Sequence, residues 1–453
     1  MTGLFYLLGV VIFVLAILAS IGLHELGHMI PAKAFGGKVT QYFIGFGPTV
    51  WSKQVGETEY GVKAVPLGGY VKIVGMLPPG AAELADEVDV DVDEQGNQVV
   101  KVRKSNTGMF TQLISDARAA EWETIKPEDS DRLFYKMVWW KKVIVMAGGP
   151  TVNLLIAFFI FAGVFATYGN PSEAKPYSPV VSGVVDCVLP AAELDRACEA
   201  SDPVAPAKAA GIEKGDRIVS FNGAPFTTWD AMQDEIRANE DGVATIVVER
   251  DGQELTLTTN TTVTARPTSI TDDKLTQVGF LGVSPTFTGL VTGGPIYTIE
   301  KMGGMTKDTV IALGTLPQKV WGVAESIAGV HPRDPNGPVS IVGGGRIAGE
   351  TVSHEDFPVK EKAVFLLMLI AGFNFFIGMF NFIPLLPLDG GHIAGALWEA
   401  MRRGWARLRG RPDPGYVDVA RLLPIAYVVA SCLLVMGLVL IVGDLVVPVR
   451  LQS

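Results

Sequence analysis

The sequence His24-Glu25-Leu26-Gly27-His28 combines two metal-ligating imidazoles with a carboxylate. If this stretch is helical, His24 and His28 lie about one turn apart on the same face, where both can bind one zinc ion. Glu25 is then positioned to accept a proton from a zinc-bound water molecule. The motif uses two of the five histidines in the chain, and it predicts a zinc hydrolase site.

The motif follows an uncharged apolar run, residues 4–23, which is long enough to cross about 30 Å of hydrocarbon as a helix. Ionisable groups at membrane depth are expensive and tend to be functional, which favours a metal site over ordinary core histidines. A signal peptide is the alternative for this run, but a basic start, a short apolar core and a cleavage site are not clear. We therefore expect a retained first span, 1–35, that carries the motif.

A possible third ligand follows another apolar run, residues 363–383. This run leads into Pro384-Leu385-Leu386-Pro387-Leu388-Asp389. Paired prolines break helical hydrogen bonding, which is tolerated at membrane depth where the backbone is buried in protein or lines a cavity. Asp389 is therefore the candidate third ligand, with the fourth position open for water. His392 is the competing ligand because imidazole is the commoner zinc ligand, and a helix cap is the alternative role for Asp389.

Four spans are expected in all, at 1–35, 136–169, 361–400 and 421–448. The second contains Gly148-Gly149-Pro150-Thr151-Val152-Asn153, whose glycines allow close helix approach and whose Asn153 could simply bond a neighbouring helix. Basic residues flank the spans at Lys33, at 136–142 and in the loop 401–420, and these segments are expected on the cytoplasmic side. The region between the second and third spans and both termini are then outside.

The segments between the spans differ in character. Residues 36–78 read as a β-meander with stretches 39–43, 49–51, 58–65 and 69–74, for which an ordinary surface hairpin is the alternative. Residues 79–135 read as an acidic cytoplasmic insertion, and its Asp86–Glu94 run does not match a calcium loop. Residues 265–360 are mildly amphipathic and are expected to lie outside the membrane core.

Residues 176–264 read as a soluble module with the order strand, turn, helix, hairpin. Asn222-Gly223 and Asp251-Gly252 are turn signals, and an amphipathic helix is expected between them. The order resembles a bacterial PDZ module, a class that binds peptide ends by strand addition. Cys187 and Cys198 lie in an extra loop, where they form either a disulfide, if the module is outside the membrane, or two free thiols.

The composition limits the class of protein. The chain has 453 residues, of which 48% are hydrophobic and 19% charged. This mixture indicates apolar spans alternating with soluble segments. A net charge of −10 argues against a nucleic-acid surface, and three cysteines are too few for a disulfide scaffold.

Taken together, the motifs at His24–His28 and Asn381–Gly391 resemble the site-2 protease family of intramembrane zinc metalloproteases, in particular the bacterial sigma-regulating members with a PDZ module. The stretches Gly45–Pro48, Pro66–Tyr70, Gly148–Asn153 and Gly337–Ile341 strengthen the resemblance, which covers nearly the whole chain. It implies a polytopic α-helical membrane protein with about four transmembrane helices, a membrane-associated β-meander and one extracytoplasmic PDZ-like α+β domain.

The resemblance also implies the roles of the site residues. Zinc would be held by His24, His28 and Asp389, with Glu25 as the catalytic base and Asn381 as a substrate-orienting amide. The β-meander would present the substrate as an added strand. The expected partners are membrane lipid and single-span membrane proteins of the anti-sigma factor type, cut within or near their span after a first cut outside. No nucleic-acid partner is expected.

The implied location is the bacterial inner membrane, with the active site toward the cytoplasmic side. Two other functions remain open at this stage. One is a zinc membrane protease that acts on loops outside the bilayer, although such enzymes typically take a third ligand from a soluble domain. The other is a PDZ-bearing scaffold with an inactive metal site, which the intact set of metal-binding residues argues against.

Overall fold

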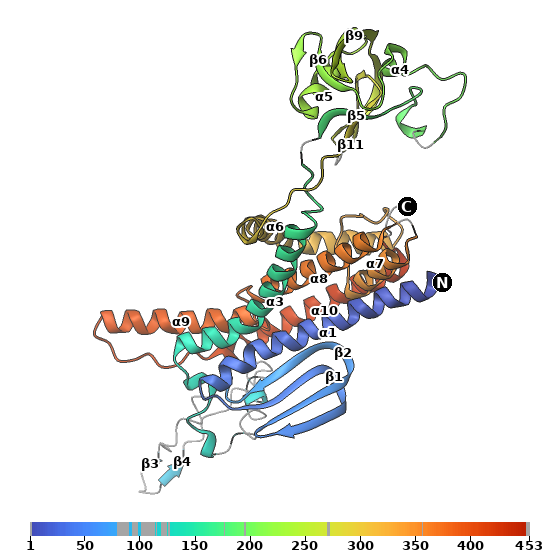
Figure 1. Ribbon diagram of the computed structural model, residues 1–453. Coiled ribbons are helices and arrows are strands. Elements are labelled where there is room, and N and C mark those ends of the chain that lie inside the picture. Colours follow the sequence, from blue (N-terminus) through green and yellow to red (C-terminus); the bar gives the residue numbers. More distant parts are fainter. Residues whose placement is uncertain are drawn as a thin grey trace. The chain divides into compact units, whose positions relative to one another are not determined.

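The computed structural model describes residues 2–78, 127–175, 177–193, 196–269, 272–355 and 357–449, together with 90–92, 98–100, 114, 116–118 and 125 (Figure 1). It divides into two compact units. Unit 1 contains Met1–Val164 and Pro295–Ser453, and unit 2 contains Phe165–Gly294. The predicted acidic run Asp86–Glu94 lies largely outside the described residues, although Val90–Val92 (β3) pairs with Gln98–Val100 (β4).

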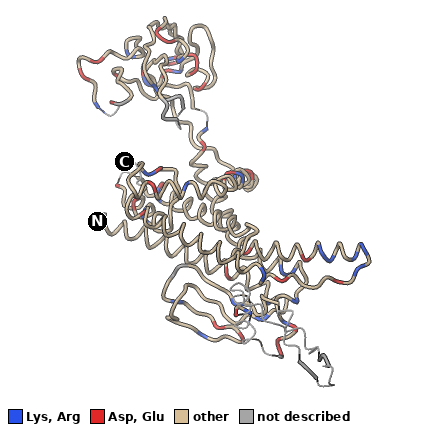
Figure 2. Tube along the Cα trace, turned by 180° about the vertical axis from the view of Figure 1, so that it is seen from behind, with Lys and Arg blue, Asp and Glu red and all other residues tan. Residues whose placement is uncertain are grey.

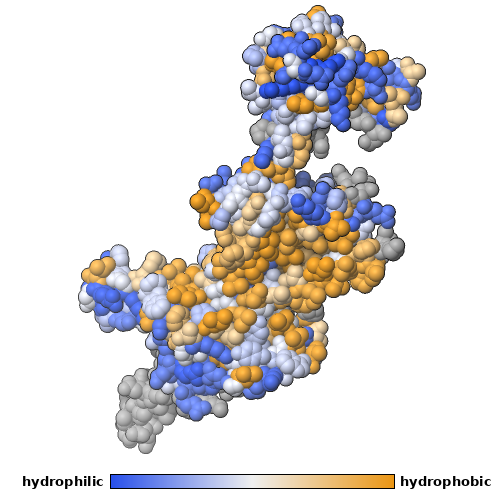
Figure 3. Space-filling model, in the orientation of Figure 1, coloured by the Kyte–Doolittle hydropathy of each residue, from blue (hydrophilic) through white to orange (hydrophobic). Residues whose placement is uncertain are grey.

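Four helices in the described part of the chain are long and apolar enough to cross a membrane. They are α1 (Thr2–Ala34), α3 (Trp139–Thr167), α8 (Val359–Asn381) and α10 (Leu423–Val446). Large apolar side chains such as Leu15, Phe159 and Leu434 are 59%, 68% and 65% exposed, which requires an apolar surrounding medium. Charges are sparse along these helices (Figure 2), and the surface over them is broadly hydrophobic (Figure 3). The expected number of long apolar helices, about four, is confirmed.

Further helices in the described part of unit 1 include α6 (Pro295–Ile327), α7 (Ile341–Ser353) and α9 (Asp389–Leu408). The span expected at 361–400 is two helices, because α8 ends at Asn381 and α9 begins at Asp389 after the two prolines. Part of the expected basic loop 401–420 is also helical, since α9 continues to Leu408. Short 3₁₀ turns lie at Pro127–Asp129, Phe134–Lys136, Ala191–Glu193 and Val419–Leu422.

Small residues bring α7 against α1. A Cβ atom on Gly9 of α1 would lie 2.4 Å from the backbone oxygen of Ala348 in α7, so the backbones touch directly. Phe13, Ile17, Ala348 and Leu366 form a buried cluster at this contact. Close approach through glycine and alanine is the usual way for helices to pack in a membrane.

The region 36–78 contains two long antiparallel strands, β1 (Val39–Val55) and β2 (Thr58–Ile73). Both strands are bent, so that different parts of one strand pair with different parts of the other. Their register makes four strand segments in the order 69–73, 39–44, 58–63 and 49–55. The β-rich stretches expected from the sequence correspond to these segments. Segment 69–73 is therefore an edge of the sheet, and no other strand pairs with its outer side among the described residues.

Unit 2 contains a mixed α and β fold around a six-stranded sheet. The sheet order is β12-β5-β6-β8-β9, with β7 paired to β6, and a β10–β11 hairpin is separate. The elements are β5 (Ser178–Val184), α4 (Pro206–Ala210), β6 (Arg217–Phe221), β7 (Ala224–Pro225), α5 (Trp229–Ala238), β8 (Val243–Arg250), β9 (Gln253–Asn260), β10 (Thr262–Ser269), β11 (Asp272–Phe280) and β12 (Val283–Thr286).

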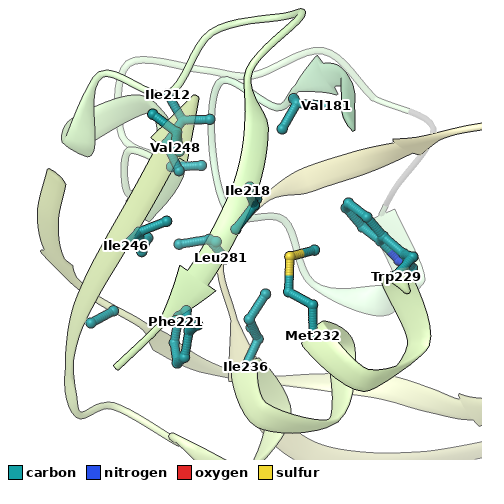
Figure 4. Close-up of a cluster of buried hydrophobic side chains, with 12 residues drawn as sticks. Val181, Ile212, Ile218, Phe221, Trp229, Met232, Ile236, Ile246, Val248 and Leu281 are labelled. Atoms are coloured by element: carbon teal, nitrogen blue, oxygen red, sulfur yellow. The ribbon is translucent and has the colours of Figure 1, made fainter. Parts of the chain in front are cut away.

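The core of unit 2 lies between α5 and the sheet (Figure 4). Ile218, Phe221, Met232 and Ile246 are at most 1% exposed. The unit extends beyond the predicted module 176–264, because β12 pairs with β5 and Leu281 joins the core. Both predicted turns have positive φ at their two central residues, as a type I′ turn requires.

The extra loop of unit 2 is closed by a disulfide between Cys187 and Cys198, whose Cα atoms are 5.9 Å apart. The sequence left this disulfide and two free thiols as alternatives. The structure favours the disulfide.

Candidate metal centre and active site

Three side chains from two distant parts of the chain meet in unit 1. The His24 Nε2 and His28 Nε2 atoms are 3.2 Å apart, and each is 3.3 Å from Asp389 Oδ2. Two ligand atoms held about 2.0–2.1 Å from a tetrahedral zinc ion are about 3.3 Å apart. The triangle therefore has the size of one face of a zinc coordination tetrahedron.

The outer nitrogens of both imidazoles have protein partners. His28 Nδ1 donates to the backbone oxygen of Val145 at 2.8 Å, and His24 Nδ1 donates to Asn153 Oδ1 at 3.0 Å. These bonds place the ring protons on Nδ1, which leaves both Nε2 atoms as lone-pair acceptors facing each other. Asp389 Oδ2 is also a buried acceptor that has no hydrogen-bond donor among the described residues. Three converging acceptors repel one another unless a cation lies between them, so this donor set fits zinc.

The spacing follows from the local structure. His24 and His28 occupy one face of α1, as the i, i+4 spacing predicts. Asp389 is the first residue of α9, directly after the two prolines that end the α8 segment. The break in the helix is what turns this carboxylate back toward α1.

Glycines allow the backbones of α1 and α3 to meet at this centre. A Cβ atom on Gly148 would lie 1.9 Å from the backbone oxygen of Gly27, so no larger residue fits there. A Cβ atom on Gly149 would lie 2.3 Å from His28 Nε2 and 2.7 Å from His24 Nε2. Gly149 therefore keeps open the space next to the two converging Nε2 atoms.

Glu25 lines the pocket beside the three candidate ligands but is not one of the three converging groups. This pocket is about 430 Å³, and the Glu25 carboxylate accepts a hydrogen bond from the Val71 backbone N–H. Gly69 is close enough that an added Cβ would be 3.1 Å from Glu25 Cγ. The edge segment 69–73 of the sheet is thus in direct contact with the predicted catalytic base.

The pocket also brings in the other residues singled out by the sequence. Asn381, at the end of α8, and His392, one turn along α9, both line it. The roles expected for Asn381 and for the third ligand stay predictions. The contact of Asn153 with His24 was not foreseen, although the Gly148–Asn153 stretch was noted as a place where helices meet.

Comparisons with known proteins agree with this arrangement. Residues 12–412 match peptidase family M50. The zinc metalloprotease Rip1 of Mycobacterium tuberculosis is 34% identical over 98% of this chain and 99% of its own length. The zinc metalloprotease RasP of Geobacillus kaustophilus is 26% identical over 87% of this chain and 90% of its own. The metalloprotease MmpA of Caulobacter vibrioides is 26% identical over 89% of both chains.

A match of this extent, with a zinc-sized donor triangle and four apolar helices, identifies the class of protein. The chain belongs to peptidase family M50, the site-2 protease family, and is an integral-membrane zinc metalloprotease.

Proposed function

We propose that this enzyme cuts single-span membrane proteins of the anti-sigma factor type, within or near their transmembrane segment, after a first cut outside the membrane. His24, His28 and Asp389 would hold the zinc ion, and Glu25 would be the general base. The observation that supports the site best is the triangle of acceptor atoms, 3.2–3.3 Å on a side, inside a helix bundle of a membrane protein.

When bound, zinc supplies a Lewis acid that polarises the scissile carbonyl and acidifies water. The chain supplies the proton transfers. The Glu25 carboxylate would take a proton from the attacking water and deliver it to the leaving amide nitrogen. The Val71 N–H that bonds to Glu25 would orient this carboxylate.

The edge segment 69–73 supports a way to hold the substrate. A peptide bond inside a helix is shielded, so a substrate span must unwind before it can be cut. An unwound strand could pair with the outer side of this edge through backbone hydrogen bonds, which do not depend on sequence. Asn381, which lines the same pocket, would orient the bound backbone by its side-chain amide.

Unit 2 supports a PDZ-like role. A cavity of about 280 Å³ lies between α5 and the segment 278–283, next to β12, which is an edge of the sheet. An extended peptide end could pair with β12 there. The Cys187–Cys198 disulfide fits an extracytoplasmic location, since disulfides persist in oxidising compartments. The active site would then open toward the cytoplasmic side of the bacterial inner membrane.

We further propose that unit 2 acts mainly as a size filter, with peptide-end binding secondary. Most side chains of a membrane span are apolar, so the intramembrane site itself has little sequence to recognise. A bulky outer domain on an uncut substrate would be excluded, whereas a trimmed stub would be accepted.

The basic test uses purified enzyme in lipid and a single-span substrate with a trimmed outer domain. Wild-type enzyme should bind one zinc and cut the substrate. Glu25→Gln should keep the zinc and lose at least about a hundredfold in rate, since general bases contribute about 10²–10⁴-fold. A zinc-loaded wild type that cuts only outer loops would favour a protease acting outside the bilayer, and one that cuts nothing would favour the scaffold.

A further inference from the structure

The C-terminal half of α9 carries apolar and basic side chains next to each other. Trp398, Met401, Trp405 and Leu408 are 53%, 59%, 58% and 85% exposed, and they recur at helical spacing. Arginines occupy positions 402, 403, 407, 409 and 411. The projecting end of α9 in Figure 3 accordingly shows hydrophilic and hydrophobic surfaces side by side. This composition is typical of helices that contact both acyl chains and anionic headgroups.

A cleft of about 490 Å³ lies beside this part of the helix. Trp398, Met401 and Trp405 line it from α9, and Pro412 and Pro414 line it from the following segment. Arg402 and Arg411 contribute its charged groups. Arg402 also donates to the Pro414 backbone oxygen at 2.8 Å, which ties the segment to the helix.

The two arginines of the cleft keep their charge available. Two acidic side chains in this part of the chain, Asp413 and Glu399, both pair with Arg403, each at 3.3 Å. Among the described residues, neither Arg402 nor Arg411 forms an ion pair. Within the described part of the chain, the cleft therefore combines an apolar wall with two cations that are not paired with a carboxylate.

The position of the cleft brings it close to lipid. Pro414 is five residues before Val419, where the last candidate membrane span begins. At its other end α9 starts at Asp389, in the pocket shared with α1 and α8. A cleft between α9 and the start of this last span is within reach of the lipids around the helices.

We propose that this cleft binds one anionic phospholipid. Its phosphate would contact Arg402 and Arg411, and an acyl chain would lie against Trp398, Met401 and Trp405. Guanidinium groups suit phosphate oxygens because they offer paired donors. The bound lipid would hold the distal part of α9 at the membrane surface.

Native mass spectrometry of the full-length, zinc-loaded enzyme in detergent tests this proposal. Wild type should retain one phosphatidylglycerol in preference to phosphatidylcholine. The double variant Arg402→Gln/Arg411→Gln should bind it at least about tenfold more weakly. Met401→Glu should also weaken lipid binding. Because Met401 is exposed, this variant should fold normally, so it tests the cleft even if the double variant does not fold. Arg407→Gln removes one charge from an exposed residue outside the cleft and should leave binding unchanged, whereas the single variants Arg402→Gln and Arg411→Gln, which also remove one charge each, should weaken binding.

Three results would overturn the proposal. One is wild-type retention of phosphatidylglycerol by both cleft variants. Another is a loss in Arg407→Gln equal to that in Arg402→Gln or Arg411→Gln, which would mean that net charge rather than the cleft holds the lipid. The third is complete displacement by millimolar inorganic phosphate, which would make a free phosphate ion the ligand.

Discussion

The two units of this protein are built on opposite packing rules. In unit 1, large apolar side chains such as Phe159 point outward, and the helices meet through glycines and polar contacts. In unit 2, apolar side chains such as Phe221 and Met232 are inside, as in any water-soluble domain. The first unit gains little from apolar burial between helices, because lipid is equally apolar. The positions of its helices depend instead on a few small residues that allow close backbone contact.

The largest effect is therefore expected from the smallest side chain. Gly149→Ala should abolish zinc binding, because the new methyl group would be within 2.3 Å of a ligand nitrogen. Gly372→Ala in the membrane helix α8 is the control, since a Cβ there meets nothing within 4 Å among the described residues. Zinc would be measured by plasma mass spectrometry and helix content by circular dichroism. Full zinc occupancy in Gly149→Ala would contradict the claim that small residues determine the geometry of unit 1.

Removing unit 2 tests whether the two units are separable. Asn170 N donates to Val291 O at 2.8 Å, so the two ends of the unit are adjacent and a short linker can replace the residues between them. The deletion should leave zinc content unchanged and should permit cleavage of a substrate with its full outer domain. Loss of cleavage of the trimmed substrate in a zinc-loaded deletion variant would show instead that unit 2 recruits substrate.

A smaller effect is expected from pH on unit 2. The guanidinium of Arg250 bonds to Asp216 at 2.7 Å and lowers the pKa of that carboxyl below its ordinary value. Because the folded pKa is the lower one, this stabilisation is present above about pH 4, the unfolded value, and is lost as the pH falls through the folded pKa.

Hydrogen exchange of β6 and β8 in the full-length protein measures this effect. Asp216→Asn should raise exchange near neutral pH, and the difference from wild type should shrink below pH 4. Asp234→Asn, on the exposed face of α5, should match wild type throughout. A difference that grows on acidification would contradict the assigned sign.

Much of the site could be predicted from the sequence because its chemistry is local. The spacing of His24 and His28 fixes their common face, and the prolines before Asp389 indicate a helix break beside a cavity. Asn153 could not be assigned to His24, because its partner depends on how α1 and α3 align over more than a hundred residues. The position of Gly149 beside His24 and His28 could not be predicted for the same reason.

Other parts of the fold could not be predicted from the sequence for similar reasons. Strand β12 has only four residues, and it is a strand because it pairs with β5, about a hundred residues earlier. A sequence pattern does not show such a distant pairing. Lys142 was taken as a charge flanking a span, yet it is 6% exposed and bonded to Glu399 at 2.8 Å. A local pattern does not distinguish a solvated lysine from one paired across the fold.

The central claim is that Asp389 completes the zinc site with His24 and His28. Zinc content per protein, measured in Asp389→Ala and His392→Ala with His24→Ala as the reference for loss, tests it most directly. We expect Asp389→Ala to lose its zinc as His24→Ala does, and His392→Ala to keep the wild-type amount. Full zinc in Asp389→Ala together with loss in His392→Ala would contradict the assignment.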